Sequence, residues 1–256
     1  MSNDANASAP SSGPGPVSRP GARSTVVIPA RFNGPPESGN GGWVSGLLAG
    51  RLTTAPAVSV RLRTPPPLER ELTLSIDGDG GLAAHDRDVL VATAMPAAPS
   101  ALTETVVEPV PFAVAQACAA AYEGRHDHPF ATCFSCGTAR EDGLGLRPGR
   151  VPDGDGAYAA SWVAREVSPE IVWAALDCPG GWSAGIAGRP MVLGTMTAAL
   201  VSLPAVGEEC VVMAWPRGGE GRKYLSGTAL YGADGRLLGR AEATWIAVDP
   251  ASVRPH

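Results

Sequence analysis

Short runs of apolar and alternating residues fill most of the chain, and turn-forming residues separate them. In the second half, the last run places Ala241, Ala243 and Trp245 on one side and polar residues on the other, as in a strand with one buried face. Asp234-Gly235 before it is a strong hairpin signal. The runs predict antiparallel strands at Met191–Leu203, Cys210–Trp215, Lys223–Tyr231 and Leu237–Val248, with turns at 204–207, 217–221 and 232–235.

The first half shows the same pattern with less contrast. It predicts strands at Thr25–Phe32, Ala57–Arg63, Glu71–Ile76 and Val89–Met95. Few segments favour helix; these are Gly42–Leu52, Val110–Tyr122 and Ser168–Leu176. Ser168 suits an N-cap, and Pro169 suits the first helical position because its missing N–H would be unpaired there anyway. The class expected is α+β.

An internal repeat divides the chain. Gly41-Gly42-Trp43 matches Gly180-Gly181-Trp182 at an offset of 139, and an apolar segment, a strand and a proline follow each copy. Each half is therefore expected to be one helix wrapped by a curved antiparallel sheet, and the two halves to pair as an internal pseudo-dimer. The predicted divisions are a mobile tail at 1–22, an N-terminal unit at 23–100, a linker helix and Cys/His loop at 101–150, and a C-terminal unit at 151–250.

Composition excludes several classes of protein. The 256 residues carry 20 Lys and Arg against 25 Asp and Glu, a net charge of −5, and no basic run that would follow a nucleic-acid backbone. The longest apolar stretch, Val110–Tyr122, is shorter than the roughly 20 residues of a membrane helix. Five cysteines without a signal peptide argue against a disulfide framework and for the cytoplasm. Lys223 is the only lysine, which suggests a GC-rich bacterial genome.

The element order, with the segment Arg31–Val44 at the head of the first unit, resembles double-hotdog acyl-CoA thioesterases. In that superfamily a His-Gly-Gly-aromatic sequence commonly opens the hotdog helix, and Asn40 stands here in place of the histidine. The segment Val172–Asp177 is similar to the hotdog-helix segment that carries the catalytic acid. The resemblance covers residues 24–96 and 155–249, and it implies two tandem hotdog units and hydrolysis of an acyl thioester.

Thioester hydrolysis needs a group that holds the developing oxyanion and a base on the opposite side of the carbonyl. Free N–H groups at a helix N-terminus suit the first task, so Gly41 and Gly42 are the expected donors. Asp177 is the expected base, and burial beside Trp173 and Trp182 would raise its pKa. The first helix carries no acid, so one active site and one degenerate site per chain are expected.

Structural interpretations of the same residues stay open. The two glycines could serve a tight turn or close packing, and Asp177 could cap a turn at Pro179-Gly180. Two alignments of the second helix also compete. The repeat pairs Gly180 with Gly41 and makes Glu37 a reserve acid, whereas the superfamily comparison pairs Ser168 with Asn40 and keeps Asp177 inside the helix; the second is preferred.

Further residues are assigned by position. In the double-hotdog type a Thr on the strand after the second helix and a polar group on the final strand help to hold the water, which implies Thr195 or Thr197 and then Thr244 or Glu242. Thr is common in β-strands for structural reasons, and this explains the presence of these residues equally well. The side chains expected to contact substrate are Trp43, Trp173 and Trp182, and those expected to meet phosphates of coenzyme A are Arg222 and Lys223, with Arg147 and Arg150 as further candidates.

His126, His128, Cys133 and Cys136 lie within 11 residues. A structural zinc site needs four ligands, and a second Cys-x-x-Cys is absent, so no metal ligand is assigned and the segment is expected to be a loop over the acyl or coenzyme A channel. Whether these residues bind a metal stays open.

The sequence thus predicts a cytoplasmic bacterial thioesterase of lipid or polyketide metabolism that acts on acyl-CoA or an acyl carrier protein, without cofactor, and that can form homo-oligomers through free strand edges. A non-catalytic acyl-thioester binding module is the alternative, because Asn40 replaces the histidine. A hotdog hydratase or dehydratase is the third.

Overall fold

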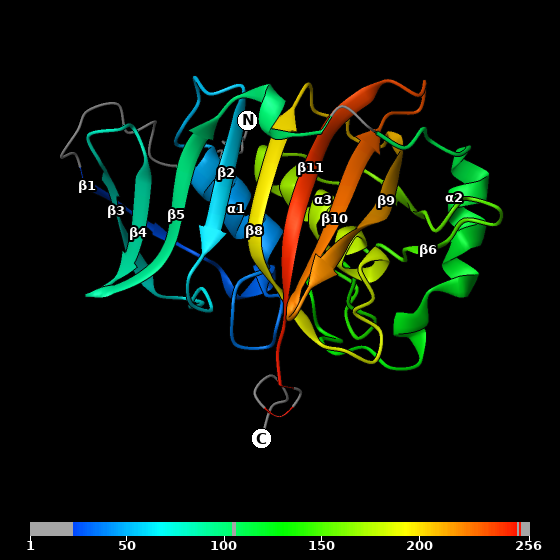
Figure 1. Cartoon of the computed structure of the whole chain (residues 1–256), viewed down its shortest axis with the longest axis horizontal. Helices are drawn as coiled ribbons and strands as arrows, with labels where there is room; N and C mark the ends of the chain where they lie inside the picture. Colours follow the sequence, from blue (N-terminus) through cyan, green and yellow to red (C-terminus); the bar gives the residue numbers. More distant parts are fainter. Residues whose placement is uncertain (1–22, 104–105, 250, 252–256) are drawn as a thin grey trace, which may run out of the picture.

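A computed structural model describes residues 23–103, 106–249 and 251 of the chain, and the predicted tail at 1–22 lies outside them. Eleven strands of this part form one antiparallel sheet in the order β1-β3-β4-β5-β2-β8-β11-β10-β9-β7-β6 (Figure 1). The strands are β1 (Arg23–Val27), β2 (Ala57–Leu62), β3 (Glu71–Ile76), β4 (Leu82–Asp86), β5 (Val89–Ala97), β6 (Gly149–Arg150), β7 (Tyr158–Val163), β8 (Met191–Leu200), β9 (Glu209–Glu220), β10 (Lys223–Tyr231) and β11 (Leu237–Ala247).

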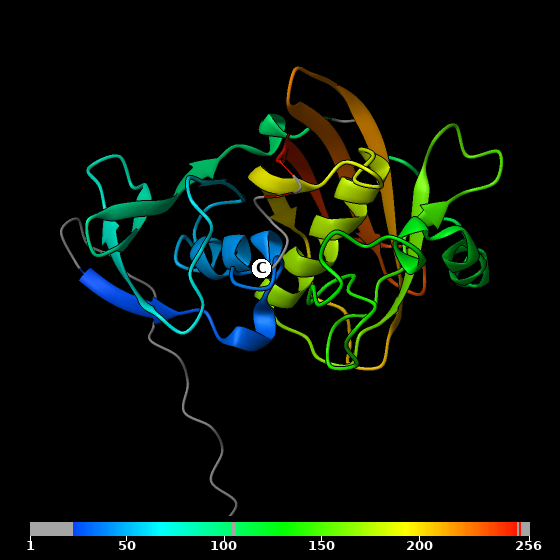
Figure 2. The same ribbon diagram turned by 90° about the horizontal axis from the view of Figure 1, so that it is seen from below.

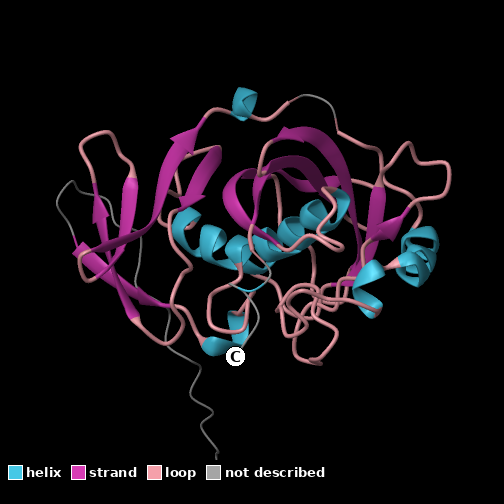
Figure 3. Cartoon of the chain, turned by 60° about the horizontal axis from the view of Figure 1, so that its bottom comes forward, coloured by secondary structure: helices cyan, strands magenta, loops and turns pink. Residues whose placement is uncertain are grey.

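The two halves of the chain meet where β2 pairs with β8. Val58 to Arg61 pair there with Ala198 to Thr195, so the sheet is continuous across the junction. The sheet curves around α1 (Gly41–Ala49) and α3 (Pro169–Ser183), which lie on its concave face (Figures 2 and 3). The α+β class and the wrapped helices agree with the sequence-based expectation.

The principal core lies between the two helices and the concave face of the sheet. Strand residues such as Val60, Leu74 and Met196 are fully buried there against helix residues such as Leu48 and Val172. A second, smaller core lies on the opposite face, where α2 (Phe112–Cys118) covers the end of the sheet that β7 and β9 form. The sheet is therefore buried on both faces at the end that β7 and β9 form.

Close contact between α1 and α3 depends on glycine. Gly42 and Gly46 lie one helical turn apart on the face of α1 that packs on α3. A Cβ atom on Gly46 would come within 2.7 Å of the Glu170 Cα, and one on Gly42 within 2.6 Å of the Trp173 carbonyl oxygen. Gly42 and Gly46 therefore allow the close packing of the two helices, while a Cβ atom on Gly41 would instead meet Leu193 of β8.

The helix boundaries decide between the two alignments of α3. Asn40 caps α1 and Ser168 caps α3, each accepting a bond from a backbone N–H three residues on. Gly180-Gly181-Trp182 lies in the last turns of α3 rather than at its start, so the repeat at offset 139 does not align the two helices. The predicted turn at Pro179-Gly180 is wrong, because α3 continues to Ser183.

Pro179 is accommodated inside α3 by side chains from elsewhere. The Ser135 and Thr228 hydroxyls donate at 2.8 Å to the Ala174 and Leu176 carbonyls. These carbonyls flank that of Ala175, which a helical N–H at residue 179 would otherwise bond. The helix extends beyond the predicted end at Leu176, and these tertiary hydrogen bonds hold its backbone on either side of the Ala175 carbonyl.

Some sheet predictions also need correction. Strand β9 extends to Glu220, so the chain reverses over Gly221 and Arg222 instead of over 217–221; Gly221 has the positive φ of 58° that the tight turn requires. Strands β4 and β7 were not among the predicted runs. None of the described helices is both long and apolar enough to cross a bilayer.

Candidate functional site

A cavity of about 790 Å³ opens beside the N-terminus of α1. Its wall includes α3, the ends of β8 and β11, the segment before α1 and the loop at 128–136. Among the lining side chains, the polar and ionisable ones are Glu37, Ser38, Asn40, Arg63, Thr64, His128, Cys133, Cys136, Asp177 and Cys178. The cavity therefore brings together groups from both halves of the chain.

Asp177 lies in the middle of α3 and is 2% exposed. Its Oδ2 accepts a hydrogen bond of 2.9 Å from the Gly42 N–H, at the N-terminus of α1. Its Oδ1 is buried and has no hydrogen-bond partner among the described residues. Burial raises the pKa of Asp177 to about 7, against the lowering effects of the Gly42 N–H and the Asn40 side chain. The carboxyl is thus held by one oxygen, and the other can accept a proton.

The N-terminus of α1 offers fewer free donors than the sequence suggests. The Gly42 N–H binds Asp177, and the Trp43 N–H donates to Asn40 Oδ1 at 2.9 Å. The Gly41 N–H has no acceptor among the described residues, and Gly41 lines the cavity. The expected pair of oxyanion donors is corrected to one, Gly41, because Gly42 is bonded to the candidate base.

Asn40 connects the helix end with the other site residues. Besides capping α1, its amide Nδ2 lies 3.7 Å from Cys133 Sγ and 3.8 Å from Cys178 Sγ as a donor. The side chain is 1% exposed. An asparagine at this position fits both tasks because its oxygen accepts and its nitrogen donates.

We expect Asn40→Ala to lower the free energy of unfolding by about 1–2 kcal/mol, because it removes the cap acceptor of α1. Asn40→Ser should recover most of this loss, since serine caps helices as well as asparagine does. Urea unfolding of the two variants measures the difference. Equal loss in both variants would contradict the capping explanation.

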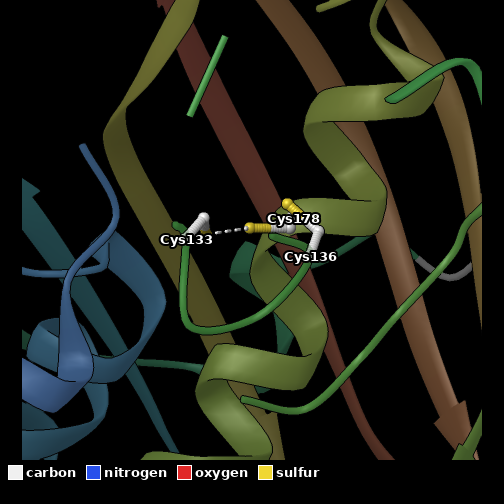
Figure 4. Close-up of side chains that lie close together, drawn as sticks. All are labelled: Cys133, Cys136 and Cys178. Carbon is white, nitrogen blue, oxygen red and sulfur yellow. Dashed lines mark hydrogen bonds between the residues drawn. The ribbon is translucent and has the colours of Figure 1, made fainter. Parts of the chain in front are cut away.

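Three cysteine thiols gather at the same wall. Sulfur atoms of Cys133, Cys136 and Cys178 all lie within 4.8 Å of one another, and those of Cys133 and Cys178 are 3.6 Å apart (Figure 4). Hydrogen bonds from the neighbouring thiols lower the pKa of Cys133, and backbone N–H groups of Ser135 and Cys136 lower it further. The sequence pointed to Cys133 and Cys136 but not to Cys178, which α3 brings in from 42 residues beyond Cys136.

The two histidines do not complete this cluster. His126 is exposed. His128 lines the cavity, but its Nδ1 accepts from the Phe130 N–H at 2.9 Å and its Nε2 lies 3.1 Å from the Cys136 carbonyl oxygen. A neutral ring with its proton on Nε2 satisfies both contacts, so His128 holds the loop in place.

The predicted water-holding residues lie elsewhere. Thr195 and Thr197 do not line the cavity, and the Thr197 hydroxyl donates to Ser59 on the neighbouring strand. Glu242 is bonded to Thr103 and paired with Arg217. Thr244 is also absent from the cavity wall. In the burial pattern of β8 and β11 these four residues are half-buried, whereas Leu193 and Trp245 are buried and line the cavity, so the structure does not bring the four to the cavity wall.

Two of the three tryptophans belong to the core. Trp43 stacks on Phe32 with ring centroids 4.1 Å apart, and Trp173 packs against Gly46. Neither lines the cavity, so substrate contact at these two positions is corrected to core packing. Trp182 does line the cavity, 2% exposed, and its Nε1 has no hydrogen-bond partner among the described residues.

The basic residues divide in a similar way. Arg147 donates to the Cys136 and Gly137 carbonyls, and Arg150 lies over the Tyr158 ring, so both act within the fold. Arg222 and Lys223 are exposed at the tip of the β9–β10 hairpin. Lys223 lies opposite Ile246 in the pairing of β10 with β11, and Ile246 lines the cavity. Neither basic side chain lines the cavity itself. Glu37, the reserve acid, is exposed at the cavity wall, remote from the buried position that Asp177 occupies.

Solved structures share this architecture over nearly the whole chain. A protein of Novosphingobium aromaticivorans provisionally named a thioesterase has 15% identity and a TM-score of 0.63, with 93% of this chain and 100% of that chain covered. The tesB protein of Mycobacterium avium subspecies paratuberculosis has 11% identity and a TM-score of 0.60 over 89% and 93%. An acyl-CoA thioesterase II of Mycobacterium marinum has 10% identity and a TM-score of 0.58 over 90% and 94%.

No protein-family model and no curated protein sequence matches the chain. The structural neighbours therefore establish the fold, which is the hotdog fold in its double form, as the sequence resemblance implied.

Proposed function

We propose that this double-hotdog chain hydrolyses an acyl thioester in the cavity between α1 and α3. The observation that carries the proposal is the pairing of Asp177 with the N-terminus of α1: the buried carboxyl is fixed by the Gly42 N–H, its Oδ1 has no partner among the described residues, and Asp177 is one of the residues that line the cavity. The names of the structural neighbours add support at the level of reaction class. We also infer that the two halves are an internal pseudo-dimer with one such site.

In the proposed reaction a water molecule donates a hydrogen bond to Asp177 Oδ1 and attacks the thioester carbonyl. The carbonyl oxygen becomes negatively charged and is stabilised by the Gly41 N–H and the positive end of the α1 dipole. The carbon–sulfur bond then breaks. The proton that Asp177 took from water passes to the departing sulfur, so a carboxylic acid and a free thiol leave.

The second candidate is an acyl-thioester binding module without hydrolysis. It is favoured by Asn40 in place of the superfamily histidine and by Leu193, an apolar side chain on the cavity-facing side of β8. A hydratase has less support, because both ring nitrogens of the cavity histidine, His128, are already hydrogen-bonded to backbone groups.

The direct test measures free thiol released from acyl-CoA substrates of increasing chain length and from an acylated carrier protein. Saturable release, with one class of carrier preferred, supports the proposal and identifies the substrate. Tight binding of a non-hydrolysable acyl-CoA analogue without release would support the binding module instead.

Several expectations remain predictions. If Arg222 and Lys223 contact phosphates of coenzyme A, replacing both by alanine should raise the KM for acyl-CoA. The KM for a truncated thioester without these phosphates should not change. Bacterial origin, a cytoplasmic location, a role in lipid or polyketide metabolism and homo-oligomer formation stay expectations from the sequence.

A further inference from the structure

The thiol cluster at the cavity wall has features that the proposed hydrolysis does not use. Cys133, Cys136 and Cys178 are all buried or half-buried, and they are free thiols. Buried cysteines usually pack singly as small apolar groups. Here three sulfur atoms from two distant segments converge, and the Asn40 amide donates to two of them. Thiolates so close together would repel one another, and a bound cation would stabilise them.

The loop that carries two of the thiols has the tight form of a metal-binding turn. The Gly137 N–H donates to the Cys133 carbonyl at 2.8 Å, which closes the turn over Cys133 to Cys136. A Cβ atom on Gly137 would lie 2.5 Å from the Ala131 and Cys133 carbonyl oxygens, so only glycine fits there.

The loop is held rigidly against the rest of the fold. The Cys136 carbonyl accepts from Tyr122 at 2.8 Å, from Arg147 at 3.1 Å and from His128 at 3.1 Å. Ser135 is fixed to α3 through its bond to the Ala174 carbonyl. The two thiols of the loop are therefore positioned beside Cys178 before any ion binds, which reduces the cost of assembling a site.

The sulfur separations fit a tetrahedral ion. With a zinc–sulfur bond of about 2.3 Å, two ligands of a tetrahedral site lie about 3.8 Å apart. The Cys133 and Cys178 sulfurs are 3.6 Å apart, and the other separations, at most 4.8 Å, need closure of no more than about 1 Å. Three thiolate ligands select thiophilic ions such as Zn²⁺.

We propose that Cys133, Cys136 and Cys178 bind one Zn²⁺ ion, with the fourth coordination position open to the cavity. All three cysteines line the cavity, so a water molecule or a sulfur or oxygen atom of a ligand can reach that position. Binding would release the protons of the three thiols to solvent. This inference differs from the sequence-based expectation of no metal, and it does not depend on hydrolytic activity.

The test adds Zn²⁺ alone to the full-length, reduced and metal-stripped protein. We expect one equivalent to bind, and the number of thiols that react with a thiol reagent to fall by three. Co²⁺ in place of Zn²⁺ should give a sulfur-to-cobalt charge-transfer band. Cys178→Ala should weaken Zn²⁺ binding by at least about 100-fold. Cys210→Ala is the control, because Cys210 is also a free cysteine but lies buried on β9 outside the cluster, and this variant should bind Zn²⁺ as the wild type does.

Binding of less than about a tenth of an equivalent by the wild-type chain would overturn the proposal, as would unchanged affinity in Cys178→Ala. If Cys178→Ala does not fold, thiol protection in the wild-type protein decides alone. A disulfide between Cys133 and Cys178 would also count against the site. It would have to be present in the isolated, metal-free protein, form again after reduction and reoxidation, and prevent Zn²⁺ binding.

Discussion

Replacing Asp177 by asparagine is expected to lower kcat for thioester hydrolysis by about 10²–10⁴-fold, the usual contribution of a general base. The substitution keeps the shape of the side chain and an oxygen that can accept from the Gly42 N–H. It removes only the capacity of the group to take a proton from water. Steady-state release of free thiol from the best acyl substrate, together with a thermal melt, measures both effects.

The matched control is Glu170→Gln. Glu170 is a carboxylate in the first turn of the same helix, it accepts from the Ser168 hydroxyl, and it does not line the cavity. The kcat of the Glu170→Gln variant should stay within about twofold of the wild-type value. A folded Asp177→Asn variant with wild-type kcat would show that Asp177 only connects the two helices, and the proposed mechanism would fail.

Sequence patterns were sufficient for most of the sheet because turn-forming residues separate the apolar or alternating runs that form its strands. The predicted runs at Glu71–Ile76 and Lys223–Tyr231 coincide with β3 and β10. The end of α3 was not predictable, because Pro179 normally stops a helix. Hydroxyls of Ser135 and Thr228 bond the neighbouring Ala174 and Leu176 carbonyls, and the sequence does not indicate that these hydroxyls lie beside this helix.

The candidate site, like the sheet, could be predicted from the sequence only in part. Asp177 and Asn40 were chosen because the segments around them resemble the corresponding segments of double-hotdog thioesterases. Thr195 and Thr197 were assigned by their position in the superfamily comparison. In the structure β8 contains an irregularity: Trp245 pairs with Leu193 while Thr244 pairs with Thr195, so Gly194 is an extra residue. One inserted residue moves the side chains that follow it to the other face of the strand, and the sequence does not indicate this. The third cysteine of the cluster was missed because Cys178 joins the other two only when α3 packs against their loop.

Gly42→Ala is expected to lower the free energy of unfolding by about 1–3 kcal/mol, the usual range for adding volume to a tightly packed core. The new methyl group would collide with the Trp173 carbonyl, which belongs to the backbone of α3 and cannot rotate away, and also with the Asp177 side chain. The helices would have to separate, and the bond between the Gly42 N–H and Asp177 would lengthen. The better helix propensity of alanine, worth about 1 kcal/mol, offsets only part of this cost.

Gly50→Ala gives the contrast within the same helix. Gly50 follows α1 with a right-handed helical φ of −61°, and a Cβ atom there would meet its nearest neighbour, the Gly46 carbonyl oxygen, at 3.4 Å. This substitution should be neutral or stabilise the protein by about 0.4–1 kcal/mol, because it restricts the unfolded chain. Urea unfolding of both variants measures the difference. Similar midpoints would mean that α1 and α3 are not in close backbone contact, and the fixed position of Asp177 at the α1 N-terminus would then lack its structural basis.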